Sequence, residues 1–271
     1  MIHLLEIQRR GAHTAEAGFP FNVPIVQSLD TLHFEQPVTF LVGENGSGKS
    51  TLLETLACAV GSITVGAQSA DRDKTLAHLQ PLAKQFKLVW AKKRNRKGFF
   101  MRSEDFFGYV KRLSAMREEM QNDLKRIDRE YADRSDFARG MAKMSYAREL
   151  KAMTDAYGED GLDANSHGES YFTLFKQRFV PGGVYLLDEP EAPLSPQRQL
   201  AFISMLHEMV KLDSQFIIAT HSPIIMAYPN ANILSFDGDS VKQVAYDDLE
   251  HVTLTRSFLN DPAAYLRHLI E

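Results

Sequence analysis

The stretch Gly43-Glu-Asn-Gly-Ser-Gly-Lys-Ser50 decides how the whole sequence is interpreted, because it fits the pattern G-x-x-x-x-G-K-[ST] without a mismatch. Its glycines allow the backbone to fold around a phosphate group with several N–H groups pointing inward. Lys49 can reach the β- and γ-phosphates of a nucleotide, and the Ser50 hydroxyl can bind Mg²⁺. The motif predicts a phosphate-binding loop made of nine consecutive residues: Gly43, Glu44, Asn45, Gly46, Ser47, Gly48, Lys49, Ser50 and Thr51.

The residues on either side of this loop supply the context that the motif requires. Val38–Val42 is a short apolar run of the kind that forms a buried strand. Residues 50–60 carry apolar side chains at helical spacing. A strand, a glycine-rich loop and a helix in this order favour a phosphate site over a glycine turn with a purely structural role.

A second buried strand is predicted at Val184–Leu187, and two carboxylates, Asp188 and Glu189, follow it directly. In enzymes with this phosphate loop, an aspartate at a strand end holds Mg²⁺ next to the loop's hydroxyl. A glutamate directly after it can deprotonate the attacking water. A solvated strand end is the alternative, and the phosphate loop upstream weighs against it.

A third buried strand, Phe216–Ala219, leads to Thr220 and His221. His221 follows Asp188 by 33 residues with one predicted helix between the two strands. This spacing places His221 at the same edge of the sheet, within reach of a γ-phosphate. A lone histidine more often has a structural role, which remains the alternative here.

Short apolar strands that alternate with helices predict an α/β fold with a mainly parallel sheet. Residues 86–91 and 99–101 flank a charged turn that ends at Gly98, and this pattern predicts a β-hairpin. From residue 104 to about 157 the sequence becomes charged and helical, which predicts an amphipathic helical lobe.

Composition excludes several other classes of protein. The chain has 271 residues, a formal charge of −4 and a single cysteine, Cys58, so an intrachain disulfide and a cysteine-rich zinc cluster are excluded. No apolar run reaches the roughly 18 residues of a membrane-spanning helix, and the first ten residues do not resemble a signal peptide. We therefore expect a cytoplasmic protein.

Together these motifs resemble the ATP-binding-cassette (ABC) ATPases, and more narrowly the soluble RecF-like heads, the heads of structural-maintenance-of-chromosomes (SMC) proteins and short bacterial proteins described as AAA or ABC-type ATPases. The resemblance implies one ABC-type P-loop ATPase domain. Its core would comprise about residues 1–103 and 164–245. A helical lobe at about 104–163 and a helical tail at 246–271 would complete the chain.

In that family a signature segment, LSGGQ or LSGGE, precedes the acidic strand. Asn165-Ser-His-Gly-Glu169 occupies this position, 22 residues before Asp188 when counted from Ser166. Ser166, Gly168 and Glu169 match the signature, whereas Asn165 and His167 depart from it. The resemblance implies that Ser166 and Gly168 cap the γ-phosphate of ATP held by a second subunit. The alternative is that Ser166 only caps the next helix.

Further family positions are implied with departures. The glutamine that contacts Mg²⁺ would fall at Glu104, which is not a glutamine. The dimer-crossing D-loop would be Ala192–Ser195, with Ser195 in place of the usual aspartate. An aromatic residue that stacks on adenine is expected before the loop, where Phe19 and Phe21 are candidates and a core position is the alternative for both.

The segment from Lys92 to Lys97 contains five cations in six residues. It could contact a nucleic-acid backbone, although a solvated charged turn is the commoner role of such runs.

The sequence thus predicts Mg²⁺-dependent ATP hydrolysis, with Lys49, Glu189 and His221 as catalytic residues and Ser50, Asp188 and Glu104 as metal ligands. We expect an ATP-gated head-to-tail homodimer in a soluble nucleic-acid-associated or defence-type system, with a protein effector as a further partner. The ATPase subunit of a membrane transporter is the alternative. A module that only binds ATP is disfavoured because Lys49, Asp188 and Glu189 are all present.

Overall fold

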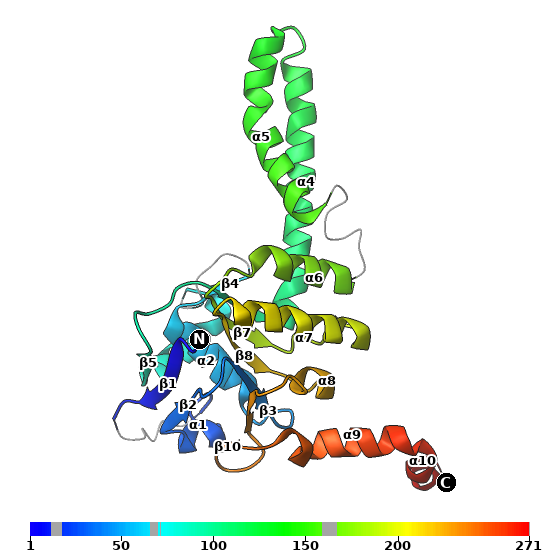
Figure 1. The fold of residues 1–271 in the computed structure, drawn as a ribbon. Helices are drawn as coiled ribbons and strands as arrows, with labels where there is room; N and C mark the ends of the chain where they lie inside the picture. The colour runs from blue at the N-terminus through cyan, green and yellow to red at the C-terminus, as the bar shows by residue number, and fades with distance from the viewer. Residues whose placement is uncertain (12–17, 66–69, 71, 159–166, 271) are drawn as a thin grey trace. The chain divides into compact units, whose positions relative to one another are not determined.

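The computed structural model describes residues 1–11, 18–65, 70, 72–158 and 167–270. Its contacts divide the chain into two compact units, one made of Met1–Ser103 with Val180–Glu271 and the other of Glu104–Phe179. Figure 1 shows the elements of both units, coloured by their position along the chain. The first unit contains two sheets, and the second is helical.

The large sheet of the first unit has seven strands in the order β10-β9-β3-β8-β7-β6-β4. Neighbouring strands are parallel except for β10 and β9. The bounds are β3 Val38–Val42, β4 Ile63–Thr64, β6 Phe99–Arg102, β7 Val184–Asp188, β8 Gln215–Ala219, β9 Asn232–Ser235 and β10 Lys242–Gln243. Every residue of β3, β7 and β8 is buried, as expected for central parallel strands that are covered on both faces.

The predicted mainly parallel α/β fold is therefore confirmed. Helices of the first unit are α1 Pro24–Ser28, α2 Lys49–Val60, α3 Gln80–Lys84, α7 Pro196–Lys211, α8 Pro223–Met226, α9 Glu250–Asn260 and α10 Pro262–Ile270, with short 3₁₀ turns at Lys74–Leu79 and Tyr246–Asp248.

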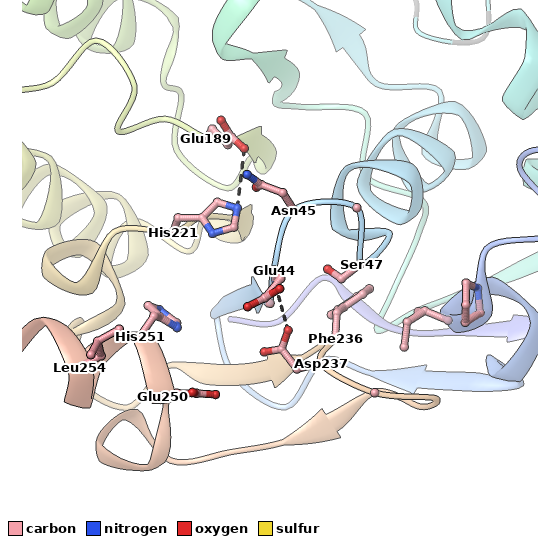
Figure 2. Close-up of a pocket in the computed structure, with 15 residues that line it drawn as sticks. Glu44, Asn45, Ser47, Glu189, His221, Phe236, Asp237, Glu250, His251 and Leu254 are labelled. Atoms are coloured by element: carbon pink, nitrogen blue, oxygen red, sulfur yellow. Dashed lines mark hydrogen bonds and ion pairs between the residues drawn. The ribbon is translucent and has the colours of Figure 1, made fainter. Parts of the chain in front are cut away.

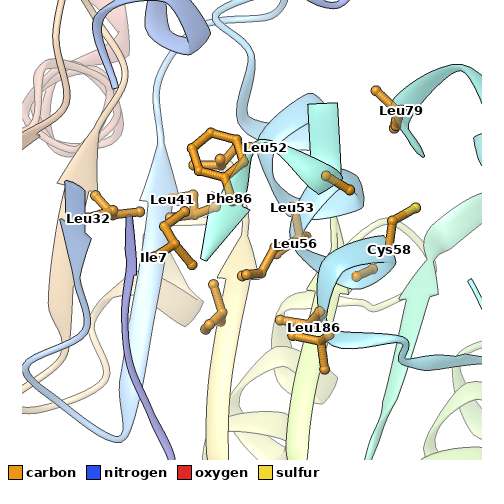
Figure 3. Close-up of a cluster of buried hydrophobic side chains, with 14 of the residues drawn as sticks. Ile7, Leu32, Leu41, Leu52, Leu53, Leu56, Cys58, Leu79, Phe86 and Leu186 are labelled. Atoms are coloured by element: carbon orange, nitrogen blue, oxygen red, sulfur yellow. The ribbon is translucent and has the colours of Figure 1, made fainter. Parts of the chain in front are cut away.

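A small antiparallel sheet completes the first unit, with the order β2-β1-β5 and the bounds β1 Leu4–Arg9, β2 Thr31–His33 and β5 Phe86–Trp90. Helix α2 contributes Leu52, Leu53 and Leu56 to a core that also contains Ile7 and Phe86 from this sheet. Leu41 and Leu186 of the large sheet belong to the same core (Figure 3). The helix that follows the glycine-rich loop is thus held firmly by both sheets.

The predicted hairpin between residues 86–91 and 99–101 is wrong. Strand β5 pairs with β1 in the small sheet, whereas β6 pairs in parallel with β7 and β4 in the large one. A Cβ at Gly98, where φ is +109°, would lie 1.9 Å from the carbonyl oxygen of Val184. Gly98 therefore marks a close approach of the backbone to β7, and the buried, non-local pairing of β6 overrides the local turn pattern.

The second unit consists of α4 Ser103–Glu130, α5 Asp136–Tyr157 and α6 His167–Arg178. Helices α4 and α5 run antiparallel as a hairpin (Figure 1), linked by an ion pair between Lys143 and Asp128 and by a 3.1 Å contact between the hydroxyls of Tyr109 and Tyr157. At about 1.5 Å per residue, the 28 residues of α4 span about 42 Å.

An aromatic cluster forms the small core of this second unit. The ring centroids of Phe106 and Tyr171 lie 4.7 Å apart, those of Tyr171 and Phe175 4.5 Å, and those of Phe175 and Phe179 4.9 Å. These rings join the first part of α4 to α6.

Candidate functional site

The glycine-rich loop connects β3 to α2 and has the backbone that only glycine adopts easily. Gly43, Gly46 and Gly48 have φ values of +141°, +83° and +100°. A Cβ at Gly48 would also lie 2.7 Å from Cγ1 of Val23. The loop therefore has both the conformation and the tight packing that a phosphate-binding loop needs.

Lys49 begins α2, and its side chain curls back into this loop. Its Nζ donates to the carbonyl oxygens of Gly43 at 2.7 Å and of Glu44 at 2.8 Å. Burial lowers the pKa of Lys49, and the negative charge of Asp237 opposes that change. The ammonium group is therefore held among the loop's backbone groups, where the phosphates of a nucleotide would meet it.

Asp188, the last residue of β7, lies beside the start of the same helix. The hydroxyl of Ser50 donates to Oδ1 of Asp188 at 3.2 Å, although 138 residues separate the two. Burial raises the pKa of Asp188 to about 7, while the hydrogen bond from Ser50 opposes this rise. The oxygens of a buried carboxylate and a neighbouring hydroxyl can bind a divalent cation, whose charge would compensate that of the carboxylate.

These two oxygen donors fit Mg²⁺, which binds one or two protein oxygens and completes its shell with water and phosphate oxygens. No group of three or more histidine, cysteine, aspartate or glutamate side chains suited to a metal occurs in the described part of the chain. Ser50 and Asp188 therefore suit a metal that also binds the phosphates of a nucleotide.

Glu189 and His221 face each other at the edge of the sheet (Figure 2). Nε2 of His221 lies 3.9 Å from Oε1 of Glu189, and the Glu189 side chain is 45% exposed. Glu189 has a φ of +49°, which is uncommon for a residue with a side chain and is found at functional sites. Burial, followed by the charge of Lys49, lowers the pKa of His221.

Two pockets flank the glycine-rich loop in the first unit. The larger, about 1070 Å³, is lined by loop residues together with Glu189, His221, Asp237 and the α9 residues Glu250, His251 and Leu254 (Figure 2). The other, about 540 Å³, is lined by Lys49, Ser50 and Thr51 and also by Phe19 and Asn22. Both pockets are lined by Asn45, Gly46 and Glu189, so each offers space for a ligand next to the loop.

Of the two aromatic candidates, Phe19 lines the second pocket and is 57% exposed. The expectation of a core position is therefore wrong for Phe19, whose ring lies 5.4 Å from that of His78 at the surface. Phe21 is partly buried and packs against the core, as that alternative predicted.

Three residues of this site were missed in the sequence. Oδ1 of Asp237 accepts a hydrogen bond from the backbone N–H of Glu44 at 2.8 Å, at the start of the loop. Asp237 follows β9, so the reasoning applied to Asp188 could have found it. Glu191 contacts the residues after β8. His251 comes from α9, for which the sequence pattern gives no signal.

The remaining predicted positions are Ser166, Gly168, Glu104 and Ser195. Ser166 lies outside the described residues. Gly168, in the first turn of α6, and Glu104, in the first turn of α4, both belong to the second unit. Ser195 is the N-cap residue of α7 and is exposed. The roles implied for these residues remain predictions.

The basic segment is only partly free to bind a ligand. Arg94 donates to the carbonyl oxygens of Val60 and Ala59 at the end of α2, which makes it a helix-capping residue. Asn95 donates to the carbonyl oxygen of Gly182 at 2.7 Å. All five cations of the segment are exposed, but Arg94 is engaged at the end of α2, so the candidates for contact with a ligand are Lys92, Lys93, Arg96 and Lys97.

Within the described residues, no helix is both long enough and apolar enough to cross a bilayer.

Two family models match the sequence. An AAA domain model matches residues 22–149. A second AAA domain model, whose description names the AbiEii toxin and the type IV toxin–antitoxin system, matches residues 170–227. No curated protein matches the sequence significantly.

Solved structures with a similar fold include SMC heads and ABC cassettes. An SMC head domain of Pyrococcus furiosus, bound to the C-terminal domain of ScpA, is 12% identical with a TM-score of 0.46, covering 96% of this chain and 99% of that one. CbiO1 of Clostridium perfringens, part of the ABC transporter complex CbiONQ, is 15% identical with a TM-score of 0.49, covering 100% and 99%. By its motifs, its mainly parallel sheet and its two AAA matches, the chain resembles the P-loop ATPase domains of the AAA-labelled, ABC-type family.

Proposed function

We propose that this chain binds Mg·ATP and hydrolyses it at the sheet edge where β3, β7 and β8 end. The likeness to two AAA domain models supports nucleotide binding and hydrolysis in general. The observation that carries the specific proposal is the contact between Ser50 and Asp188, which joins the phosphate loop to the acidic strand end. Parallel pairing of β7 with β8, which sets Asp188 opposite Ala219, brings His221 to the same edge.

Each residue then has a defined task. The loop N–H groups and Lys49 bind the β- and γ-phosphates. Ser50 and Asp188 would hold the Mg²⁺, which neutralises phosphate charge when it is bound. Glu189 accepts a proton from the attacking water. His221, largely neutral because its pKa is lowered, can donate a hydrogen bond to the γ-phosphate from the ring nitrogen that faces the cavity.

The replacement Lys49→Ala tests the loop. It removes the cation that reaches the phosphates, so Mg·ATP affinity or turnover should collapse while the far-UV circular dichroism spectrum stays unchanged. Arg94→Ala is a matched control, because it also removes a cation that contacts backbone carbonyls but lies away from the loop. Unchanged ATP binding by calorimetry together with unchanged phosphate release in Lys49→Ala would contradict the proposal.

We further propose that two copies close head to tail on two nucleotides. The match of Ser166 and Gly168 to the signature supports this idea. A hydrolysis-deficient Glu189→Gln chain should then form a dimer in ATP and remain a monomer in ADP. Adding Ser166→Arg should abolish the dimer, because bulk and charge would fill the space of the γ-phosphate contact, while ATP still binds.

Light scattering coupled to size exclusion decides between the outcomes. An equal mass in ATP, in ADP and in the double variant would contradict the dimer and leave a P-loop ATPase that works as a monomer. This result would not affect the assignment of the hydrolysis site, which is measured separately by phosphate release.

For the wider process, we propose a nucleic-acid-associated or defence-type role. The description of the second AAA model, which names a toxin and a toxin–antitoxin system, supports the defence-type class. Four of the five exposed cations, Lys92, Lys93, Arg96 and Lys97, are the proposed contact with a phosphate backbone. Replacing these four with serine, with Arg94 kept to cap α2, should flatten the salt dependence of binding to an oligonucleotide.

No binding to single- or double-stranded oligonucleotides at low salt, with or without ATP, would contradict the nucleic-acid contact. A pull-down with Glu189→Gln in ATP would then identify the partner. Capture of a membrane permease would favour the transporter alternative, and capture of a soluble effector would favour the defence-type role.

A further inference from the structure

Glu191 lies in the turn between β7 and α7, two residues after Glu189. Its Oε1 accepts two hydrogen bonds, one from the hydroxyl of Thr220 at 2.8 Å and one from the backbone N–H of His221 at 2.7 Å. Thr220 is completely buried. A single carboxylate oxygen thus holds both residues that follow β8.

A second contact ties the same two segments together. The backbone N–H of Glu189 donates to the carbonyl oxygen of Ala219 at 2.9 Å, which extends the parallel pairing of β7 and β8 by one residue. Beyond that point the strands end, and Glu191 is the side chain that continues the connection. The hydroxyl of Thr220, while donating to Glu191, also accepts from the backbone N–H of Ser222 at 3.0 Å.

The arrangement fixes the direction of the His221 side chain. The backbone N–H of His221 points to Glu191, and its ring nitrogen Nε2 points to Glu189 at 3.9 Å. Nε2 is buried and makes no hydrogen bond to any described residue, which leaves it available to a ligand in the larger pocket. Without Glu191, the buried hydroxyl of Thr220 and the amide of His221 would lose their acceptor.

We propose that Glu191 is a positioning residue for hydrolysis, which holds the His221 segment so that its imidazole faces Glu189 and the phosphate site. This inference rests on the proposed ATPase function. Glu191 acts through His221 and does not touch the reacting atoms. A displacement of about 1 Å at a reacting centre can lower a rate by about 100-fold, so the effect of losing this contact should be large for a residue outside the phosphate loop.

Steady-state kinetics on four single variants test the proposal. Glu191→Ala should lower kcat by about 10- to 100-fold with little change in KM. Glu191→Gln keeps an acceptor oxygen in place and should recover most of that loss. Glu191→Asp keeps the charge but is shorter by one methylene, so its kcat should lie between those of the Gln and Ala variants. Glu208→Ala, at an exposed glutamate of α7, is the control and should leave kcat unchanged.

A double-mutant cycle with His221→Ala then separates positioning from general stability. If Glu191 acts through His221, adding Glu191→Ala to His221→Ala should lower kcat no further. Amide exchange of His221 gives a readout that is independent of turnover: it should be faster in Glu191→Ala and unchanged in Glu191→Gln.

The two proposals fail in different ways. A wild-type chain without ATP turnover would contradict the proposed function itself. Wild-type turnover with an unchanged kcat in Glu191→Ala, or with additive effects in the cycle, would overturn the inference alone. If Glu191→Ala does not fold, a wild-type kcat in Glu191→Asp would overturn it in the same way.

Discussion

The sheet-based unit and the helical unit of this chain differ in how firmly their residues are held. All fifteen residues of β3, β7 and β8 are buried, whereas none of the residues of α5, all of which are described, is buried. Phe137, Met141 and Met144 of α5 are 79%, 54% and 59% exposed. The residues assigned to chemistry lie at the ends of the buried strands, and the helices of the second unit carry exposed apolar side chains.

We propose that the two units have different roles, with the groups for hydrolysis in the sheet-based unit and contacts with other molecules made by the helical unit. Hydrolysis needs groups held within a few tenths of an ångström, which a close-packed parallel sheet provides. Exposed helical positions tolerate substitution, so their sequence is free to serve contacts with other molecules. Three sets of variants test whether substitutions in the two units differ in their effect on stability.

The largest expected effect is on the stability of the sheet-based unit. Phe100 of β6 is completely buried, and Phe100→Ala should lower the free energy of unfolding by about 3–5 kcal/mol through lost contacts and a cavity. Met144→Ala, at an exposed position of α5, should change it by less than about 0.5 kcal/mol. Urea unfolding followed by circular dichroism measures both, and similar losses in the two variants would remove the distinction between the units.

The second effect of comparable size depends on pH. Because burial raises the pKa of Asp188 to about 7, the folded chain binds more protons at this group than the unfolded chain does between about pH 4 and pH 7. The free energy of unfolding of the metal-free protein should therefore fall as the pH rises through this window. In Asp188→Asn this contribution is absent, since the amide does not titrate.

With a chelator present, the free energy of unfolding of the wild type should therefore fall between pH 4 and pH 8, relative to that of Asp188→Asn, by up to about 4 kcal/mol. Adding Mg·ADP at pH 8 should reverse the order, because the wild-type carboxylate then has a cation to bind. Parallel stability curves for the two proteins across this range would contradict the burial of an unpaired charge at Asp188.

The smallest effect compares two glycines. Gly48→Ala should lower stability by about 1–3 kcal/mol, because φ is +100° and the added methyl group would meet Val23. Gly140→Ala, in the second turn of α5 with open space around its Cα, should raise the stability of the helical unit by about 0.5–1 kcal/mol. Thermal unfolding checks the pair. A loss in both variants would mean that α5 is as tightly constrained as the phosphate loop.

Local sequence patterns predicted the fold and most residues of the candidate site. The glycine-rich loop between β3 and α2 is a local motif, and Asp188, Glu189 and His221 each follow a buried apolar run. Parallel strands bring their carboxyl ends to one edge of a sheet, so knowing the strands was enough to bring these residues together.

The features that the sequence did not predict depend on non-local packing. Strands β5 and β6 are neighbours in the chain, but the burial of β6 against β7 separates them into two sheets. The role of Glu191 is visible only once β7 and β8 are adjacent. His251 reaches the site from a helix whose own pattern carries no indication of a ligand, and Phe19 is exposed where a core position was expected.

The replacement Glu189→Gln gives the most direct test of the central claim, that hydrolysis takes place where β3, β7 and β8 end. It keeps the size of the side chain and removes its basicity. Phosphate release should slow by about 10²- to 10⁴-fold, while calorimetry shows Mg·ATP binding within a few-fold of the wild type. Phosphate release at the wild-type rate by this variant would contradict the account, because the base would then lie elsewhere in the chain.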